Sequence, residues 1–237
     1  MGMTNSRDYA KIEVRNEVGM IKAIIFDMDG VLFDTENFYL KRRETFLAEK
    51  GISISHVDAK EFIGGRLEEV WRKFLAHYDL HFDVKELRAE YTAYKSQHKA
   101  PYVDLIFPDV KEVLETLYRM NIQMGLASNS ELSDIKLALE SSGIASYFSV
   151  VLSGSDFTQA KPNPEIYNVA CDKLGFDKAE TLIIEDSEKG IAAGKAAGID
   201  VMAIRDKIFG IDQSQADIIV EDLMDVLAYV KEERNNC

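Results

Sequence analysis

The stretch IKAIIFDMDGVLFDT, residues 21–35, joins an apolar run to two closely spaced aspartates. The run from Ile21 to Phe26 consists mostly of β-forming residues and lies between two glycines, which is typical of a buried strand. Asp27 and Asp29 therefore lie at the carboxyl end of a strand, the edge at which open α/β sheets bind ligands. Two carboxylates at this spacing can have different roles, because one can attack or bind a metal while the other moves a proton. Gly30 lets the backbone turn sharply out of the sheet.

Two other interpretations of this Asp-x-Asp-Gly string have to be weighed. An EF-hand loop has glycine at position six and a bidentate glutamate at position twelve. Counted from Asp27, these positions hold Leu32 and Phe38, so the string is not an EF-hand loop. An acidic turn that merely ends a strand stays open from this motif alone, because a short motif needs context.

Composition limits the class of protein. The 237 residues, 46% of them hydrophobic, are enough for one large domain or for a core domain that carries an insert. The formal net charge is −13, which argues against binding to nucleic acid or to an anionic membrane, since both need basic patches. We interpret the acidity as a solubility feature.

Cysteine usage and the amino-terminal segment indicate a cytoplasmic protein. Cys171 falls within an expected helix and Cys237 is the last residue, so the sequence has neither a disulfide framework nor metal-ligand spacing. No apolar run approaches the length of a membrane span. Residues 1–19 are polar and charged and have no signal-peptide core, and we assign them to an arm of unknown role.

From residue 104 onward, expected helices alternate with expected strands. The helices are expected at 110–120, 132–142, 165–174, 189–197 and 223–233, and the strands at 122–127, 150–152, 181–184, 201–204 and 218–220. This alternation predicts βαβ units and a parallel sheet, which the strand at 21–26 joins from the other end of the chain. We therefore predict an α/β fold with a doubly wound, Rossmann-like parallel sheet, built from residues 20–35 and 104–237.

Residues 36–103 have a different character. Apolar residues in their middle part follow the i, i+3, i+4, i+7, i+8 spacing of one helix face: Leu67, Val70, Trp71, Phe74 and Leu75. Further helices are expected at 38–50 and 84–94, and no clear strand is expected in this segment. We predict an all-helical cap domain over residues 36–103, inserted directly after the Asp-x-Asp turn.

Two further motifs fall near the carboxyl ends of expected strands. Ser128-Asn129-Ser130 offers hydroxyl and backbone N–H groups, and Ser128 and Asn129 are candidates for binding a phosphate oxygen. The alternative is a helix N-cap, a role that all three residues suit. Lys161 precedes an expected helix and would carry positive charge into the site, whereas the alternative is an ordinary solvated lysine.

Glu185 and Asp186 directly follow the apolar strand at 181–184. Paired carboxylates at the end of a buried strand are costly unless a positive group meets them, and a divalent cation is the natural partner. Capping of the next helix by Asp186 or Ser187 is the alternative, and it is compatible with metal binding.

The order Asp-x-Asp-Gly, Ser, Lys-Pro, Glu-Asp resembles the haloacid dehalogenase superfamily, from Met20 to the end of the chain. The place of the helical insert matches the subgroup with a helical cap after the first motif. The segment DMDGVLFDT, residues 27–35, looks like the branch that contains β-phosphoglucomutases and sugar phosphatases.

The resemblance implies a role for each motif residue. Asp27 would be the nucleophile, would form an aspartyl-phosphate and would bind Mg²⁺. Asp29 would act first as general acid and then as general base, with its backbone carbonyl on Mg²⁺. Ser128 and Lys161 would hold the phosphoryl oxygens. Asp186 would complete the metal site, in which Glu185 would be a direct or water-mediated ligand. Phosphoryl transfer needs mainly positioning and charge neutralisation, which this set provides.

The same resemblance narrows the reaction. Dehalogenases and phosphonate hydrolases of the superfamily lack a carboxylate at the position of Asp29, so neither activity is expected. Similar mutases carry a histidine in the first cap helix, where this sequence has Asn37, Phe38 and Tyr39 and no histidine before His56. The expected function is therefore a Mg²⁺-dependent phosphatase for a small sugar or polyol phosphate, with β-phosphoglucomutase activity as the runner-up.

Three further expectations concern a loop of the cap, an alternative class of protein and the oligomeric state. The loop Ile63-Gly64-Gly65-Arg66 resembles the substrate-specificity loop of the superfamily, and Arg66 would bind a second anionic group or else be an ordinary surface arginine. A non-enzymatic, receiver-like phospho-acceptor module is the alternative from another class, although receivers carry their aspartate on a later strand. The protein is expected to be a monomer or a weak homodimer.

Overall fold

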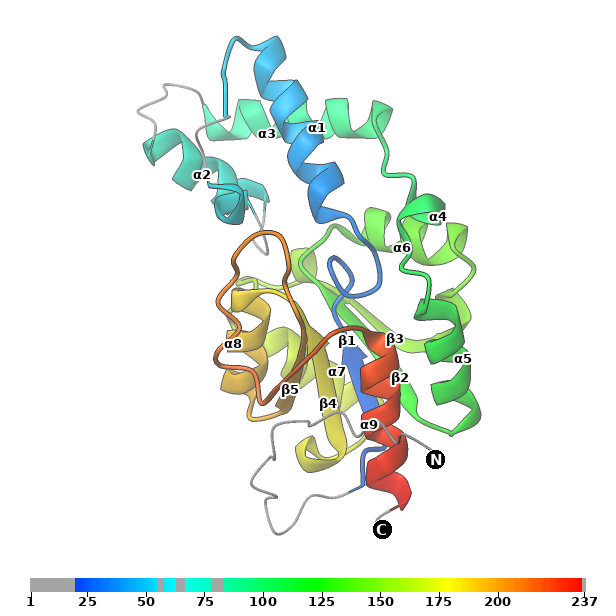
Figure 1. Ribbon diagram of the computed structural model, residues 1–237. Helices are drawn as coiled ribbons and strands as arrows, with labels where there is room; N and C mark the ends of the chain where they lie inside the picture. Colours follow the sequence, from blue (N-terminus) through cyan, green and yellow to red (C-terminus); the bar gives the residue numbers. More distant parts are fainter. Residues whose placement is uncertain (1–19, 55–57, 63–66, 78–82, 236–237) are drawn as a thin grey trace, which may run out of the picture.

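The computed structural model describes residues 20–54, 58–62, 67–77 and 83–235. In this part of the chain, six parallel strands form one sheet in the order β3-β2-β1-β4-β5-β6 (Figure 1). The strands are β1 Ala23–Phe26, β2 Gln123–Ser128, β3 Phe148–Ser153, β4 Thr181–Glu185, β5 Asp200–Ile204 and β6 Ile218–Val220.

Strand β1 lies in the middle of the sheet, between β2 and β4. The chain runs outward from β1 through β2 to β3, and then returns to the other side of β1 to build β4, β5 and β6. This reversal is the switch point of a doubly wound sheet, where the carboxyl ends of neighbouring strands leave a crevice for ligands. The predicted fold class is confirmed.

The two faces of the sheet are covered by different helices (Figure 1). Side chains of a strand alternate between faces, so Ile24 and Phe26 pack in one apolar cluster and Ile25 packs in another. The first cluster includes residues of α5 Val110–Arg119, α6 Leu132–Ser141 and α9 Leu223–Asn235. The second includes residues of α7 Glu165–Leu174 and α8 Glu188–Ala197.

Each core helix and strand begins and ends within two residues of its predicted bounds. The short elements were not predicted, because a single helical turn has too few residues to show a period. They are α4 Tyr102–Leu105, η1 Ala59–Phe62, η2 Ala145–Tyr147, η3 Gly154–Asp156 and η4 Lys178–Glu180.

Above the carboxyl edge of the sheet lie α1 Glu36–Glu49, α2 Leu67–His77 and α3 Val84–Gln97 (Figure 1). These helices have an apolar cluster of their own, centred on Phe46, Trp71 and Tyr91, which is separate from the two clusters of the sheet. Four of the five residues expected on one face of α2 are buried in this cap cluster. The side chain of the fifth, Leu67, lies outside the described part.

This separate cluster supports the proposed cap at 36–103, and we keep the proposal with one refinement. Ala100 and Tyr102 pack with the sheet cluster instead of the cap cluster. The return to the core therefore begins a few residues before the proposed boundary at 104. In the described part of the chain, every helix is too short or too polar to cross a membrane.

Candidate active site

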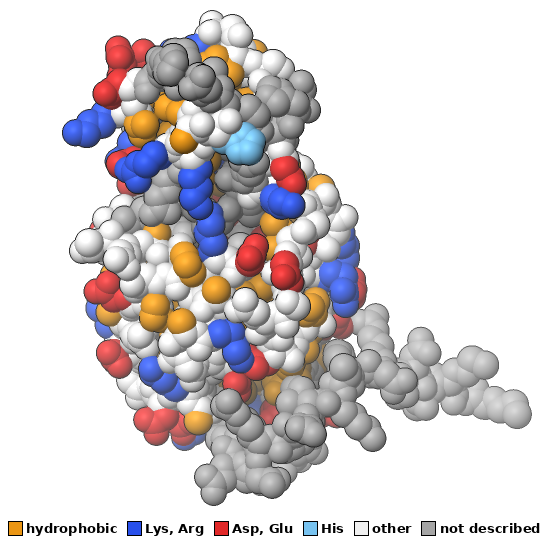
Figure 2. Space-filling model, turned by 90° about the vertical axis from the view of Figure 1, so that its left-hand side faces the viewer, with side chains coloured by type: hydrophobic (Ala, Val, Ile, Leu, Met, Phe, Trp, Pro, Cys, Tyr) orange, Lys and Arg blue, Asp and Glu red, His pale blue; other side chains and the backbone are white. Residues whose placement is uncertain are grey.

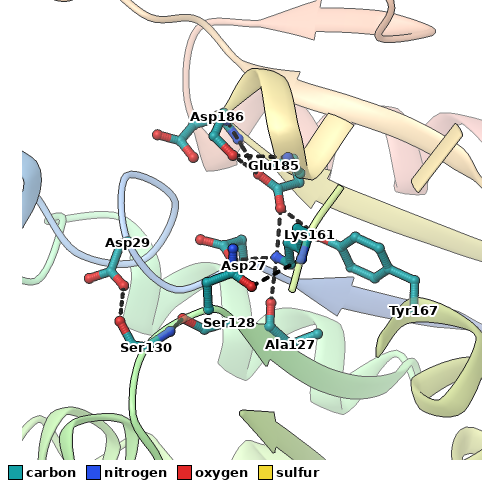
Figure 3. Close-up of polar contacts among 12 residues, drawn as sticks. Asp27, Asp29, Ala127, Ser128, Ser130, Lys161, Tyr167, Glu185 and Asp186 are labelled. Atoms are coloured by element: carbon teal, nitrogen blue, oxygen red, sulfur yellow. Dashed lines mark hydrogen bonds and ion pairs between the residues drawn. The ribbon is translucent and has the colours of Figure 1, made fainter. Parts of the chain in front are cut away.

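Asp27 lies directly after β1, with its backbone N–H donating to the carbonyl of Ile184 at 2.9 Å. Its carboxylate accepts a hydrogen bond from Lys161 Nζ, with Oδ1 and Nζ 2.6 Å apart (Figure 3). Burial raises the pKa of Asp27 to about 8, and the nearby carboxylates of Glu185 and Asp29 act in the same direction against Lys161. Burial and the neighbouring carboxylates together therefore outweigh the effect of Lys161 on the pKa of Asp27.

Lys161 is buried, with 2% of its surface exposed, so the interpretation as a solvated lysine is wrong. Its Nζ donates to Asp27 Oδ1 at 2.6 Å, to the carbonyl of Ala127 at 2.7 Å and to Glu185 Oε1 at 2.7 Å. Burial opposes the charge, but the two carboxylates outweigh it and raise the pKa of Lys161. All three donors of the ammonium group are used, which fixes its position beside Asp27.

Glu185, the last residue of β4, holds Lys161 in place. It is fully buried, and its Oε1 also accepts from the hydroxyl of Tyr167 at 2.5 Å (Figure 3). Its Oε2 accepts from the backbone N–H of Asp186 at 3.1 Å and from the hydroxyl of Ser187 at 3.2 Å. Burial would raise the pKa of Glu185, but Lys161 and these donors lower it. Both oxygens of this candidate metal ligand thus already have protein partners.

Asp186, the next residue, is a candidate metal ligand that lies among other carboxylates. Burial raises its pKa well above the usual value, and the carboxylates of Glu185, Asp27 and Glu36 add to the effect. Carboxylate oxygens of Asp27, Glu185 and Asp186 lie within 4.8 Å of one another. A hard divalent cation with oxygen ligands fits this donor set and would relieve its repulsion. The helix α8 is capped by Ser187, whose hydroxyl accepts from the N–H of Gly190, and not by Asp186.

Asp29 lies apart from this cluster, on the turn that follows β1 (Figure 3). Its Oδ1 accepts from the hydroxyl of Thr35 at 2.6 Å and its Oδ2 from that of Ser130 at 2.7 Å. Burial raises the pKa of Asp29, against the effect of these hydroxyls. The two aspartates of the motif therefore differ in surroundings, since Asp27 contacts a cation and Asp29 contacts neutral hydroxyls.

The Ser128-Asn129-Ser130 segment lies at the end of β2. Helix α6 has Glu131 at its N-cap position, so the capping interpretation of this segment is wrong. Ser128 is buried and its hydroxyl accepts from the N–H of Ser130 at 3.0 Å. Asn129 Oδ1 accepts from the backbone N–H of Lys161 at 3.3 Å, which joins β2 to the Lys161 loop. The segment thus faces the same edge as Asp27.

A cavity of about 910 Å³ opens between the cap helices and this edge, and Asp27, Asp29, Ser128, Lys161 and Asp186 line its core side. Its other walls come from α1, α3 and α6 and carry several Lys and Arg side chains. Figure 2 shows charged side chains of both signs on the narrow region between cap and core.

The Arg66 prediction lies outside the described residues. Two contacts of the site were not predicted from the sequence, namely those of Thr35 with Asp29 and of Tyr167 with Glu185. Thr35 was quoted as part of the first motif, and its contact with Asp29 six residues earlier could have been anticipated there. Tyr167 gave no signal, because it reaches Glu185 from another element.

A family model described as haloacid dehalogenase-like hydrolase matches residues 24–204. The chain belongs to this family. Both aspartates of the first motif and the Lys-Pro and Glu-Asp motifs fall within the matched range. The resemblance stated from the motifs is confirmed, and the receiver-like alternative is excluded.

Several relatives are named as phosphatases. The pyrophosphatase PpaX of Listeria monocytogenes serotype 4a is 30% identical over 221 residues, which cover 91% of this chain and 99% of the relative. Validoxylamine A 7'-phosphate phosphatase of Streptomyces hygroscopicus subsp. limoneus is 27% identical over 210 residues, covering 87% of this chain and 96% of the relative. The prediction of an enzyme of the phosphoric monoester hydrolase class is confirmed.

Among solved structures, β-phosphoglucomutase from Clostridium difficile is similar over 92% of this chain and 98% of its own, with a TM-score of 0.78 and 22% identity. A predicted phosphoglycolate phosphatase from Haemophilus somnus 129PT has a TM-score of 0.75 and 22% identity, covering 90% and 99% of the two chains. At this identity the match shows the shared fold. This haloacid dehalogenase-like hydrolase therefore shares its fold with mutases and phosphatases alike.

Proposed function

We propose that this hydrolase is a Mg²⁺-dependent phosphatase that cleaves a small phosphorylated metabolite through an aspartyl-phosphate on Asp27. The observation that carries the proposal is the contrast between the two aspartates at one cavity. Asp27 is held at 2.6 Å by a buried lysine, whereas Asp29 is held by neutral hydroxyls. Two carboxyls in such different surroundings suit one nucleophile and one acid–base group.

In the first step, a carboxylate oxygen of Asp27 forms a bond to phosphorus as the bond to the leaving oxygen breaks. Asp29 gives its proton to that oxygen, so the product leaves as an alcohol. The Ser128 hydroxyl donates to an oxygen of the phosphoryl group, and Lys161, whose three donors have protein partners, places its positive charge beside the group, where negative charge has to be stabilised. Glu185 keeps Lys161 in position throughout.

In the second step, water attacks phosphorus and the bond to Asp27 breaks. Asp29, now ionised, takes the proton of the water, and inorganic phosphate leaves with Asp27 restored. Mg²⁺ would be held by Asp27, Asp186 and the backbone carbonyl of Asp29, with Glu185 direct or through water. When bound, it supplies charge neutralisation for the phosphoryl group.

For the substrate, we propose a sugar or polyol phosphate. The charged and hydroxyl side chains that line the cavity suit hydroxylated compounds, and a relative is named for the 7'-phosphate of validoxylamine A. Pyrophosphate is a second candidate, because other relatives are named pyrophosphatases. We rank mutase activity lower, since Tyr39, in the cap segment where similar mutases have a histidine, is buried against Tyr102. We also propose a cytoplasmic location and a monomer or weak homodimer.

A screen of phosphorylated metabolites, pyrophosphate and 4-nitrophenyl phosphate tests the proposal, scored for both phosphate release and isomer formation. We expect hydrolysis that requires Mg²⁺ and stops on addition of a chelator. Asp27→Asn should abolish turnover while the far-ultraviolet circular dichroism spectrum stays unchanged, because amide and carboxylate have the same shape. Full activity in Asp27→Asn would contradict the mechanism. Faster conversion of β-glucose 1-phosphate to glucose 6-phosphate than to free phosphate would favour the mutase.

A further inference from the structure

The loop between β5 and β6, residues 205–217, carries a buried glutamine that reaches the residue after β4 (orange in Figure 1). Gln213 is 6% exposed. Its Nε2 donates to the backbone carbonyls of Asp186 and Ile204, each at 2.7 Å, and its Oε1 accepts from the backbone N–H of Asp206 at 3.0 Å. A carbonyl can only accept, so these partners determine which end of the amide faces Asp186. The two steps described above do not use this residue.

Both backbone polar groups of Asp186 are therefore bound by side chains. Its N–H donates to Glu185 Oε2 at 3.1 Å, and its carbonyl accepts from Gln213 at 2.7 Å. Asp186 lies between the last residue of β4 and the beginning of α8 and belongs to neither element. These two side chains thus supply hydrogen bonds that a strand or helix would otherwise give to its peptide groups. Because the backbone sets the direction of the Cα–Cβ bond, they also determine where the carboxylate points.

We propose that Gln213 is a positioning residue for the metal site, which holds the backbone of Asp186 so that its carboxylate meets that of Asp27. This inference rests on the proposed function, because that function makes Asp186 a metal ligand. Oxygens of these two carboxylates and of Glu185 lie within 4.8 Å of one another. A shift of the Asp186 backbone would change that arrangement, and groups that orient metal ligands in this way strengthen metal binding.

A neutral amide suits this position better than a charged group. Its two N–H groups meet two carbonyls and its oxygen meets an N–H, so each donor has a partner. A carboxylate of the same shape could only accept, and it would face two carbonyl oxygens. The amide also adds no charge to the carboxylates of the site. Through Ile204, the last residue of β5, it ties the Asp186 backbone to the neighbouring strand.

The test measures metal binding to the protein without substrate. Mn²⁺ serves as the probe, because it prefers oxygen ligands as Mg²⁺ does, and electron paramagnetic resonance detects the free ion. Gln213→Met keeps an unbranched side chain of similar length but cannot donate to Asp186. We expect its Kd for Mn²⁺ to rise about 10–100-fold, the usual effect of removing a group that orients a metal ligand. The Mg²⁺ concentration for half-maximal hydrolysis of 4-nitrophenyl phosphate should rise in parallel, whereas kcat at saturating Mg²⁺ should stay close to that of the wild type.

Asp217→Asn is the matched control at the other end of the same loop. Asp217 accepts from the backbone N–H of Val201 at 2.8 Å and pairs with Lys195, and Val201 lies near the opposite end of β5 from Ile204. The Kd of this variant for Mn²⁺ should equal that of the wild type. Circular dichroism in the presence of chelator checks that each variant folds. If Gln213→Met does not fold, Gln213→Asn, whose amide is one methylene shorter, gives the same comparison.

The outcomes separate this inference from the phosphatase proposal. An unchanged Kd in Gln213→Met, or an equal rise in Gln213→Met and Asp217→Asn, would overturn the inference and leave the phosphatase proposal intact. A wild type that binds Mn²⁺ but hydrolyses no phosphate ester would contradict the phosphatase proposal, while the comparison of Kd values still decides the inference. If the wild type binds no divalent cation, the metal site fails and the inference fails with it.

Discussion

At the scale of single residues, the site depends on a buried charge cluster around Lys161. Lys161 lies between Asp27 and Glu185, which are 8% and 0% exposed. Each charge has been removed from water, so the loss of one partner leaves another charge uncompensated. Glu185 therefore has a structural effect as well as an effect on the position of Lys161.

Glu185→Gln tests this directly. The amide keeps the shape but removes the negative charge, so the buried ammonium loses one of its two compensating partners. We expect the free energy of unfolding in urea to fall by about 3–5 kcal/mol, the usual cost of breaking a buried ion pair, and we expect turnover to fall with it.

Glu221→Gln is the matched control. Glu221 also pairs with basic side chains, Arg205 at 2.6 Å and Lys207 at 3.0 Å, but about half of its side chain is exposed. Solvent screens such pairs, so this variant should unfold almost like the wild type. Equal effects of the two substitutions would mean that the cluster around Lys161 is not a coupled unit.

The sequence located the residues that face the crevice but not all of those that hold them. Asp27, Ser128 and Asp186 could be predicted because each ends or directly follows a strand, and all parallel strands of a sheet end at one edge. Tyr167 could not, because its contact with Glu185 depends on how α7 is rotated against its neighbours. Side-chain packing sets that rotation, and the rotation cannot be derived from a single sequence.

At the scale of elements, the turn after β1 brings two distant segments together. Gly30 has a φ of +80°, and a Cβ atom at this position would collide with the carboxylate of Asp186. Glycine thus serves both the turn and the close approach of the metal-ligand candidate. Only the turn could be assigned from the sequence, since the contact with Asp186 joins residues that are far apart in the chain.

Gly30→Ala should therefore weaken Mg²⁺ binding by displacing the Asp186 carboxylate. Gly51 provides the control, because its φ of +75° is similar and a Cβ atom there would meet nothing within 4 Å. Both alanine variants carry the strain of a positive φ, about 1–2 kcal/mol, but only Gly30→Ala displaces Asp186. We expect it to raise the Mg²⁺ concentration needed for half-maximal activity by at least about tenfold, with little change in Gly51→Ala. The same Mg²⁺ dependence in both variants would show that strain alone is responsible.

At the scale of the whole molecule, cap and core are joined by ion pairs beside the cavity. Lys95 of α3 lies 2.5 Å from Asp134 of α6, and Arg88 of α3 lies 3.5 Å from Glu131. All four residues line the cavity. The sequence predicted the cap and its place after the first motif, but not which of its faces turns to the core. The orientation of the cap on the core depends on these ion pairs, which join residues about 40 positions apart in the chain.

Lys95→Met tests whether these pairs hold the cap over the substrate. The Lys95–Asp134 pair is partly exposed, with 18% and 25% of the side chains accessible, so it contributes at most about 1 kcal/mol. That free energy corresponds to about a fivefold effect, which we expect as a higher KM at low ionic strength. Because salt screens such a pair, the wild-type KM should rise towards that of the variant as salt is added.

Lys50→Gln is the control. It removes an ion pair with Glu90 that lies wholly within the cap, and it should leave KM unchanged. If Lys95→Met and Lys50→Gln behave alike, or if the wild-type KM is independent of salt, cap and core do not close through this pair.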